Sequence, residues 1–161
     1  MKIHAITVYQ PWATLIAIGA KTIETRSWAI DIQRWAIETS GRMGPLAIHA
    51  AKAIYKEHPL WFSNKFCMDA LLSAGYYDMR TLPRGSVISF AYLQDCVRIT
   101  PEFTAQLSEQ ELSFGDFAQG RWAWILKDVR RLPEPIPARG RQGIWRWEVP
   151  EGLLNAEHES T

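Results

Sequence analysis

Short hydrophobic segments separated by polar turns run along the whole chain, and most are of strand length. Residues 3–8 and 46–50 are short apolar runs, and residues 86–99 are rich in β-branched and aromatic side chains. Residues 121–129 and 144–149 predict two further strands. Helical patterns lie between some of these segments, so the order of elements predicts an α+β fold.

Three segments carry helical signals. Residues 12–18 are apolar, follow Pro11, which is favoured in the first turn of a helix, and end at Gly19, a typical C-terminal cap. Apolar residues recur with helical spacing between Pro59 and Gly75. A short acidic helix is predicted from Pro101 to Glu111.

Two segments show neither the helical nor the strand periodicity of hydrophobic residues. Residues 29–44 mix polar and aromatic residues over a length that is often functional, so they are a candidate lid or a plain surface insertion. Residues 132–137 contain three prolines, which cannot donate backbone hydrogen bonds, and we expect an extended connector there.

A polar strand follows the first predicted helix. The β-branched residues 22–25 favour a strand, whose period of two places Thr22, Glu24 and Arg26 on one face. A carboxylate and a guanidinium at this spacing can pair, and Lys21 adds a second cation. Such alternation is also typical of a solvated face. A tight strand–helix–strand unit leads into this polar strand, and that context favours a binding site for a negatively charged or amide-bearing ligand.

Four short motifs follow one another along the chain. They are Gln10-Pro11-Trp12-Ala13, then Gly19-x-Lys21-x-x-Glu24-x-Arg26-Ser27-Trp28, then Ile48-His49-Ala50-Ala51-Lys52, and Arg139-Gly140-Arg141-Gln142-Gly143-Ile144-Trp145. In this order they resemble the activating signal cointegrator homology (ASCH) domain of the PUA-like superfamily. The resemblance spans residues 1–150 and implies one domain, a PUA-like small β-barrel with flanking helices. Residues 151–161 are expected to form a flexible C-terminal tail.

The resemblance also implies a ligand cleft between the Lys-x-x-Glu-x-Arg strand and the Arg-Gly-Arg-Gln-Gly loop. Arginine and lysine would bind phosphates, tryptophan would stack on a base, and glutamine would pair with a base edge. The expected partner is single-stranded RNA, another nucleic acid or a nucleotide. The predicted ligand-binding residues are Gln10, Pro11, Trp12, Lys21, Glu24, Arg26, Ser27, Trp28, His49, Lys52, Arg139, Arg141 and Gln142.

Some bacterial relatives within the family are hydrolases, which implies an alternative function. The chain would then be a metal-independent ribonuclease, or an amidohydrolase acting on a modified nucleoside. Lys21 and Glu24 would form the acid–base pair, and Arg26 would stabilise developing negative charge. The amidohydrolase relatives carry threonine where this chain has Glu24, and Thr22 and Thr25 are offset from that position, which disfavours this version.

Composition limits these functions further. The 161 residues, 47% hydrophobic and 22% charged, fit one globular domain. A net charge of +1 argues against coating nucleic acid by bulk electrostatics. Basic residues nevertheless outnumber acidic ones between residues 121 and 146, which predicts either a local phosphate-binding stripe or solvated loop arginines. The eight tryptophans suit base stacking, core packing or a protein-interaction domain, the third class of function.

Metals, cofactors and membranes are not expected. Cys67 and Cys96 form neither a metal site nor a disulfide framework, and Cys67 is expected to be a buried thiol. No second histidine or cysteine stands at metal-ligand spacing from His49. The sequence shows no signal-peptide pattern and no apolar run approaching the ~20 residues of a membrane span, so a cytoplasmic location is expected.

Overall fold

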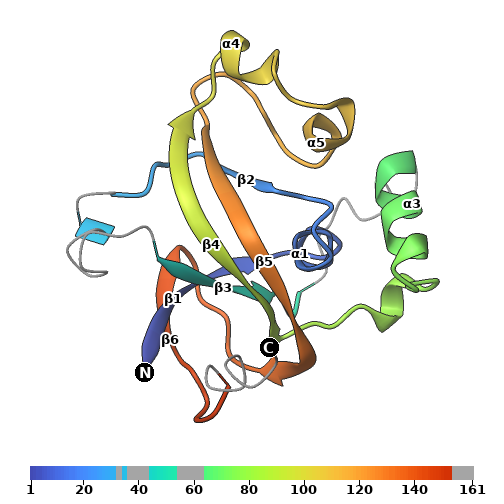
Figure 1. The fold of residues 1–161 in the computed structure, drawn as a ribbon, viewed down its shortest axis with the longest axis vertical. Coiled ribbons are helices and arrows are strands. Elements are labelled where there is room, and N and C mark those ends of the chain that lie inside the picture. The colour runs from blue at the N-terminus through green and yellow to red at the C-terminus, as the bar shows by residue number, and fades with distance from the viewer. Residues whose placement is uncertain (32–33, 36–43, 54–63, 154–161) are drawn as a thin grey trace, which may run out of the picture.

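The computed structural model describes residues 1–31, 34–35, 44–53 and 64–153. Within these residues six strands form one mixed sheet in the order β2-β5-β4-β3-β1-β6 (Figure 1). The strands are β1 (Lys2–Val8), β2 (Ile23–Arg26), β3 (Pro45–Ala50), β4 (Ser86–Arg98), β5 (Trp122–Pro137) and β6 (Ile144–Glu148). The helices are α1 (Trp12–Ala17), α3 (Lys65–Ser73), the 3₁₀ turn η2 (Met79–Thr81), α4 (Pro101–Thr104) and α5 (Glu109–Ser113).

The sheet is barrel-like but not closed, because β2 and β6 lie at opposite ends of the strand order. Strands β1 and β3 are parallel, and the other neighbours in the sheet are antiparallel. The long strands β4 and β5 run side by side through the molecule, with α4 and α5 at the end where one leads to the other (Figure 1). The predicted α+β class and PUA-like barrel architecture are therefore confirmed.

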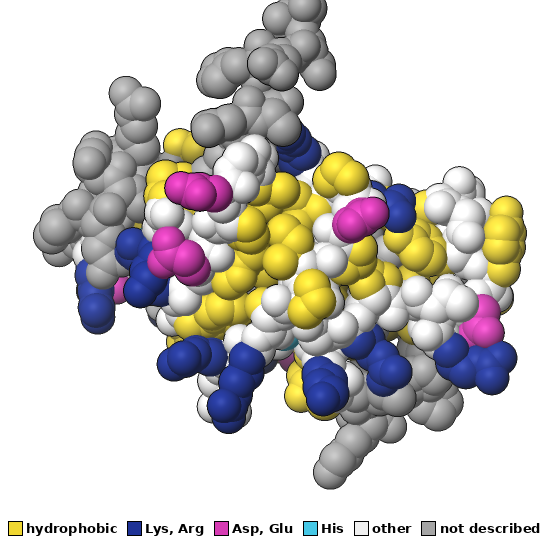
Figure 2. Space-filling view, turned by 90° about the horizontal axis from the view of Figure 1, so that it is seen from below, with side chains coloured by type: hydrophobic (Ala, Val, Ile, Leu, Met, Phe, Trp, Pro, Cys, Tyr) yellow, Lys and Arg dark blue, Asp and Glu magenta, His cyan; other side chains and the backbone are white. Residues whose placement is uncertain are grey.

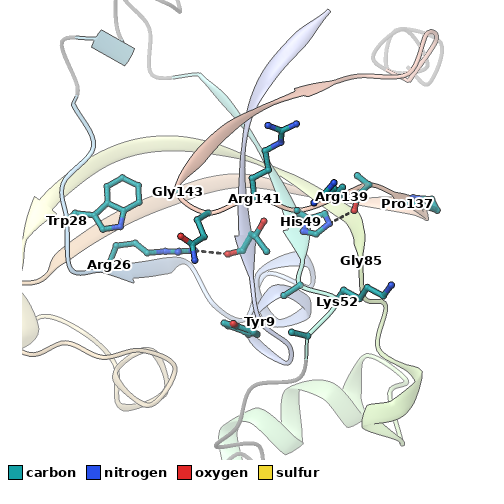
Figure 3. A pocket seen from close by; sticks show the side chains of 16 residues that line it. Tyr9, Arg26, Trp28, His49, Lys52, Gly85, Pro137, Arg139, Arg141 and Gly143 are labelled. Carbon is teal, nitrogen blue, oxygen red and sulfur yellow. Dashed lines mark hydrogen bonds between the residues drawn. The ribbon is translucent and has the colours of Figure 1, made fainter.

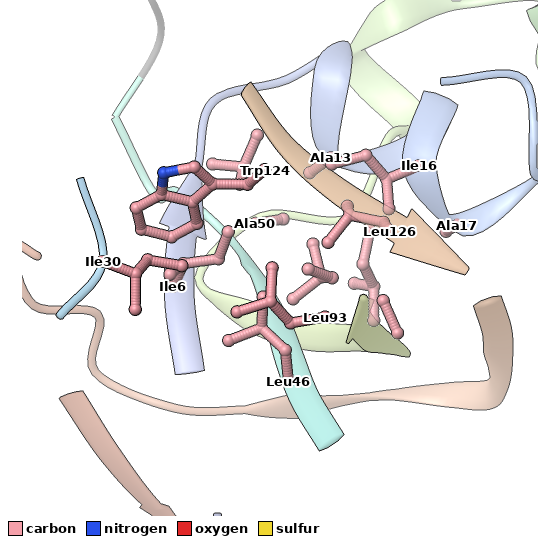
Figure 4. Packing of buried hydrophobic residues seen from close by; sticks show 14 of the residues in the cluster. Ile6, Ala13, Ile16, Ala17, Ile30, Leu46, Ala50, Leu93, Trp124 and Leu126 are labelled. Atoms are coloured by element: carbon pink, nitrogen blue, oxygen red, sulfur yellow. The ribbon is translucent and has the colours of Figure 1, made fainter. Parts of the chain in front are cut away.

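The largest hydrophobic cluster lies between α1 and the curved sheet (Figure 4). Side chains of α1, β1, β3, β4 and β5 belong to this cluster, and Trp124 is its largest fully buried member. A second cluster holds Trp145 and Trp147, which lie two residues apart on β6 and therefore share one of its faces. Burial of this apolar area, worth roughly 25 cal/mol per Å², is the main force that holds the sheet curved.

Strand β1 is covered on both faces, and this determines where the polar side chains emerge. Ile6 belongs to the first cluster, whereas Ala5 belongs to the second. The alternation of a strand places Thr7 on the side of Ala5. Its register partner on β3 is His49. The parallel pairing therefore sets a hydroxyl and an imidazole side by side where the two strands end.

The helix signals in the sequence were largely informative. Helix α1 ends before Gly19, whose φ of +80° suits glycine. Helix α3 begins after Asn64, whose side chain accepts a hydrogen bond from the Cys67 backbone N–H, and ends before Gly75. The predicted start of this helix at Pro59 lies outside the described residues.

Two predicted elements were wrong. The single acidic helix from Pro101 to Glu111 is two helices, because Ser108 caps α5 separately from α4. The proline-rich segment is no separate connector, since β5 continues through it to Pro137. A register shift between the Ser89–Arg131 and Val87–Ile136 pairs accommodates the prolines within the strand.

The candidate lid at residues 29–44 lies mostly outside the described residues, as does most of the predicted tail at 151–161. The described part of the first segment includes Trp35. Its indole is 3% exposed and stacks on the His4 ring, with 4.0 Å between the ring centroids. This tryptophan is therefore a packing residue.

Candidate functional site

A cavity of about 1150 Å³ opens where β1, β2 and β3 end, beside the loop of residues 138–143 (Figure 3). Among the described residues that line it, four side chains are cationic and none is a carboxylate. We call it the basic cavity. Its cations are Arg26, Lys52, Arg139 and Arg141, and the other described lining residues are Thr7, Tyr9, Trp28, His49, Ala51, Ala53, Gly85, Pro137, Ala138, Gly140, Gln142 and Gly143.

The floor of the basic cavity is polar and fixed in place. His49 Nε2 lies 2.7 Å from the carbonyl oxygen of Ala138, which can only accept, so Nε2 carries the proton. Burial lowers the pKa of His49 below its ordinary value of 6.5, and the ring is therefore neutral at pH 7. Beside it, Trp145 Nε1 donates to the Thr7 hydroxyl over 3.2 Å.

Gly140 closes this floor, and its lack of a side chain is a steric requirement. A Cβ at this position would lie 2.6 Å from His49 Cε1 and 2.9 Å from Thr7 Oγ1. Gly140→Ala is therefore expected to push the 138–143 loop outward and to lower the free energy of unfolding by about 1–3 kcal/mol. Urea denaturation would measure this.

The matched control for that substitution is Gly143→Ala in the same loop. A Cβ on Gly143 meets nothing within 4 Å, but the φ of +67° favours glycine, so a loss of about 1 kcal/mol is expected. Equal stability of Gly140→Ala and the wild type would contradict the close packing over His49.

Arg26 and Trp28 form one side of the cavity, and Lys52 and Arg139 lie on the other (Figure 3). The Arg26 guanidinium donates to the Thr7 carbonyl oxygen over 2.9 Å, which links β2 to β1. Trp28 is 38% exposed, and its ring meets another indole in the core edge-on. The wall thus presents an anchored cation next to an accessible aromatic surface.

A second cleft of about 660 Å³ adjoins the basic cavity, and the two share Thr7, Tyr9 and Arg26 as lining residues. Lys21 and Glu24 line this second cleft, and both are almost fully buried. Burial lowers the pKa of Lys21, against the opposing influence of the nearby carboxylates. The Glu24 carboxylate lies 4.0 Å from the Arg26 Nε, so the predicted pairing along β2 is present at long range.

Lys21 and Glu24 are buried, whereas side chains on a solvated strand face would be exposed. Lys21 Nζ donates to the carbonyl oxygens of Ile23 and Phe114, at 2.6 and 2.7 Å. Glu24 Oε1 accepts from the Thr25 backbone N–H at 3.0 Å. Two backbone carbonyl oxygens therefore hold the ammonium, and Lys21 lines the second cleft instead of the basic cavity.

The predicted site residues fall into three groups. The basic cavity contains Arg26, Trp28, His49, Lys52, Arg139, Arg141 and Gln142. The second cleft contains Pro11, Trp12, Lys21 and Glu24, together with Arg26. Gln10 and Ser27 line neither one. Gln10 instead supports α1, because it donates to the Pro83 carbonyl oxygen at 2.7 Å and accepts from the Thr14 backbone N–H at 3.0 Å.

The predicted set of site residues did not include Thr7, Tyr9 and Gly85, which also line the basic cavity. Thr7 and Tyr9 flank the end of an ordinary apolar strand, so nothing local marks them. Gly85 has a φ of +62° and approaches the Lys52 side chain. Gly85 precedes β4 and Lys52 follows β3, so local sequence gives no sign of this contact.

The basic residues between 121 and 146 do not form one stripe. The Arg121 side chain lies 3.5 Å from the Asp116 carboxylate, and Lys127 lies over the Tyr92 ring. Arg131 binds the Tyr76 hydroxyl. Arg139 and Arg141 line the basic cavity. Figure 2 shows a face whose centre is hydrophobic, with several lysine and arginine side chains along its lower edge and others at its sides and top.

Metal-binding clusters, reactive thiols and membrane-spanning helices would each indicate another kind of function. Among the described residues, no three His, Cys, Asp or Glu side chains are grouped to hold a metal ion. Cys67 and Cys96 are free and buried, and burial raises the pKa of the Cys67 thiol to about 12, which disfavours a nucleophilic thiolate. None of the helices in the described ranges has the length and hydropathy needed to cross a bilayer.

Comparison with known proteins agrees with this architecture. The family model for the ASCH domain matches residues 6–136. Activating signal cointegrator 1 from Homo sapiens is 23% identical over 146 residues, which cover 88% of this chain and 22% of that protein, and the Mus musculus protein gives the same values. The chain therefore spans less than a quarter of the length of these curated relatives.

The solved structures show the shared fold. The crystal structure of ASCH from Zymomonas mobilis has a TM-score of 0.50 and 20% sequence identity, covering 90% of this chain and 87% of that one. A serine-to-alanine mutant of the same Zymomonas mobilis protein has the same TM-score and coverage at 19% identity. At these identities the likeness extends to the fold alone.

Proposed function

Because the chain belongs to the ASCH domain family, we propose that its basic cavity binds single-stranded RNA or a related nucleotide. The observation that carries the proposal is the convergence of four cations with no carboxylate among the described lining residues, in a protein of net charge +1. Phosphates neutralised by such side chains release counterions, which favours binding at low salt. The guanidinium forks of the arginines match phosphate oxygens geometrically.

Exposed aromatic rings beside the cations favour an unpaired strand over a duplex. Tyr9 and Trp28 are 43% and 38% exposed and line the same cavity. Bases stack on such rings when they are not held in a double helix. Gln142, also in the lining, offers both a donor and an acceptor to a base edge. The cavity therefore suits a few nucleotides of single-stranded RNA.

Arg26→Ala and Arg141→Ala are each expected to weaken binding of a short labelled RNA by about tenfold and to reduce the slope of log affinity against log salt by about 0.7. Each substitution removes one phosphate-binding cation from the basic cavity. Fluorescence anisotropy at several salt concentrations would measure both quantities.

Arg98→Ala is the matched control, because it removes the same charge from the far end of β4. Arg98 is exposed and lies outside both the cavity and the cleft. The RNA affinity and the salt slope of Arg98→Ala should stay near those of the wild type. An equal loss in all three variants would show a dependence on net charge alone and would contradict the site.

A metal-independent hydrolase is the second candidate function. It is favoured by the second cleft, where a buried lysine with a lowered pKa and a buried carboxylate lie beside Arg26. Lys21 and Glu24 would act as the acid–base pair on RNA or on the amide of a modified nucleoside. Product formed by the wild type and abolished in a folded Glu24→Gln variant would establish this activity.

A further inference from the structure

Two side chains of the second cleft carry hydrogen-bonding capacity that no described residue takes up. A lysine ammonium has three N–H groups, and Lys21 directs two of them to the carbonyl oxygens of Ile23 and Phe114. Glu24 is 8% exposed, and its Oε2 is buried with no hydrogen-bond partner among the described residues. A buried carboxylate oxygen without a donor is unfavourable, so a ligand that donates to it would be stabilised.

The position of this cleft tells which part of a ligand would enter it. It shares Arg26, Tyr9 and Thr7 with the basic cavity, so one nucleotide can reach both. Among its described lining residues the carboxylates of Glu24 and Asp116 oppose the cations of Lys21, Arg26 and Arg121. The described lining of the basic cavity has cations and no carboxylate, so a phosphate is better placed there. About 660 Å³ is within the range of small-molecule pockets and can hold a base. The basic cavity would then hold the phosphates.

We propose that Lys21 and Glu24 recognise the edge of one nucleobase that presents a carbonyl oxygen next to a ring N–H, as uracil and guanine do. The free N–H of Lys21 Nζ donates to the carbonyl, and Glu24 Oε2 accepts from the ring N–H. This inference rests on the proposed RNA binding and adds the class of base to it.

The same two side chains favour these bases over cytosine and adenine. Those bases present an amino group next to an unprotonated ring nitrogen. A ring N–H beside a carbonyl is more acidic than an amino group, so its hydrogen bond to the Glu24 carboxylate is stronger. The carbonyl oxygen is likewise a good acceptor for the Lys21 ammonium. Charged partners of this kind discriminate between bases by about tenfold.

The test compares three RNA strands of about six nucleotides, which carry uracil, 3-methyluracil or no base at all. The wild type is expected to bind the uracil strand about tenfold more tightly than the abasic one. In 3-methyluracil a methyl group replaces the ring N–H, so that strand should bind no better than the abasic strand. Equal affinity for the uracil and 3-methyluracil strands would overturn the inference.

A cytidine strand and the Glu24→Gln variant extend the test. Cytidine should bind about tenfold more weakly than uridine. In Glu24→Gln, whose fold is checked by circular dichroism, the ratio between the uracil and abasic dissociation constants should fall from about ten to about two, because the acceptor loses its charge. If the ratio of the two dissociation constants were unchanged, Glu24 would not be the residue that recognises the base.

The outcomes also separate this inference from the proposed function. Salt-sensitive binding of all strands with equal affinity would retain the RNA-binding cavity and reject base recognition by Lys21 and Glu24. Absence of binding to every strand would reject both.

Discussion

Lys21→Met is expected to lower the free energy of unfolding by about 3 kcal/mol, although methionine has a similar volume. The substitution leaves the carbonyl oxygens of Ile23 and Phe114 without their donor, and each buried unpaired group costs about 1–3 kcal/mol. It also removes the cation between Glu24 and Glu111. Part of this loss is offset because a buried ammonium no longer has to be desolvated.

Lys65→Met is the control for the lost charge. Lys65 is exposed at the start of α3, and a surface change of this kind stays within about 0.5 kcal/mol. Urea denaturation at neutral pH measures both variants. A loss below about 1 kcal/mol for Lys21→Met would show that water or a rearranged donor replaces the ammonium.

The pH dependence of the free energy of unfolding, compared between the wild type and Lys21→Met, gives a second readout. Burial lowers the pKa of Lys21 in the folded state below its ordinary value of 10.5. Between the folded pKa and 10.5 the unfolded chain binds a proton that the folded protein does not, so the free energy of unfolding rises with pH. Lys21→Met lacks this contribution. The stability difference between the wild type and Lys21→Met should therefore grow as the pH approaches 10.5 from below.

Lys21 also shows where sequence reasoning stops. The motif and strand spacing group Lys21, Glu24 and Arg26, and all three line the second cleft. The partner that turns the ammonium inward is Phe114, 93 residues further along the chain. No periodicity reports such a contact, so the sequence could not distinguish a phosphate-binding lysine from one that anchors a loop to β2.

The fold was more predictable than the site, because repeated local patterns define strands. The apolar runs identified β1, β3, β4 and β6 nearly to their ends. The proline-rich end of β5 was misjudged, since prolines remove donors, but a register shift against β4 tolerates them. The outcome there depended on the partner strand, which local sequence does not describe.

The basic loop illustrates the contribution of the resemblance. Its glycines and arginines alone also fit an exposed turn, but the family resemblance implied that this loop and the Arg26 strand line one cleft. In the structure Arg26, Arg139 and Arg141 all line the basic cavity. The parallel pairing of β1 with β3 sets Thr7 beside His49, and Gly140 covers both. That arrangement is a tertiary property without a sequence signal of its own.

Trp124→Ala is expected to lower the free energy of unfolding by about 3–5 kcal/mol, because it empties the largest fully buried side-chain volume of the main cluster. Trp124 packs within a cluster that includes side chains of α1, β1, β3 and β4 (Figure 4), and closely packed neighbours cannot all move into the space. Trp122→Ala, on the same strand but partly exposed, should cost clearly less. Thermal and urea denaturation would rank the two variants.

The same substitution should also weaken RNA binding at temperatures where the variant is folded. The Trp28 ring meets Trp124 edge-on at 4.9 Å, and the Arg26 guanidinium lies 5.8 Å from the Trp124 ring centroid. The indole thus supports both residues that form one wall of the basic cavity, and losing it frees them from their bound geometry. Trp124→Phe keeps an aromatic ring there and should recover part of the affinity. If Trp124→Ala bound RNA as tightly as the wild type, the wall of the cavity would not depend on the core beneath it.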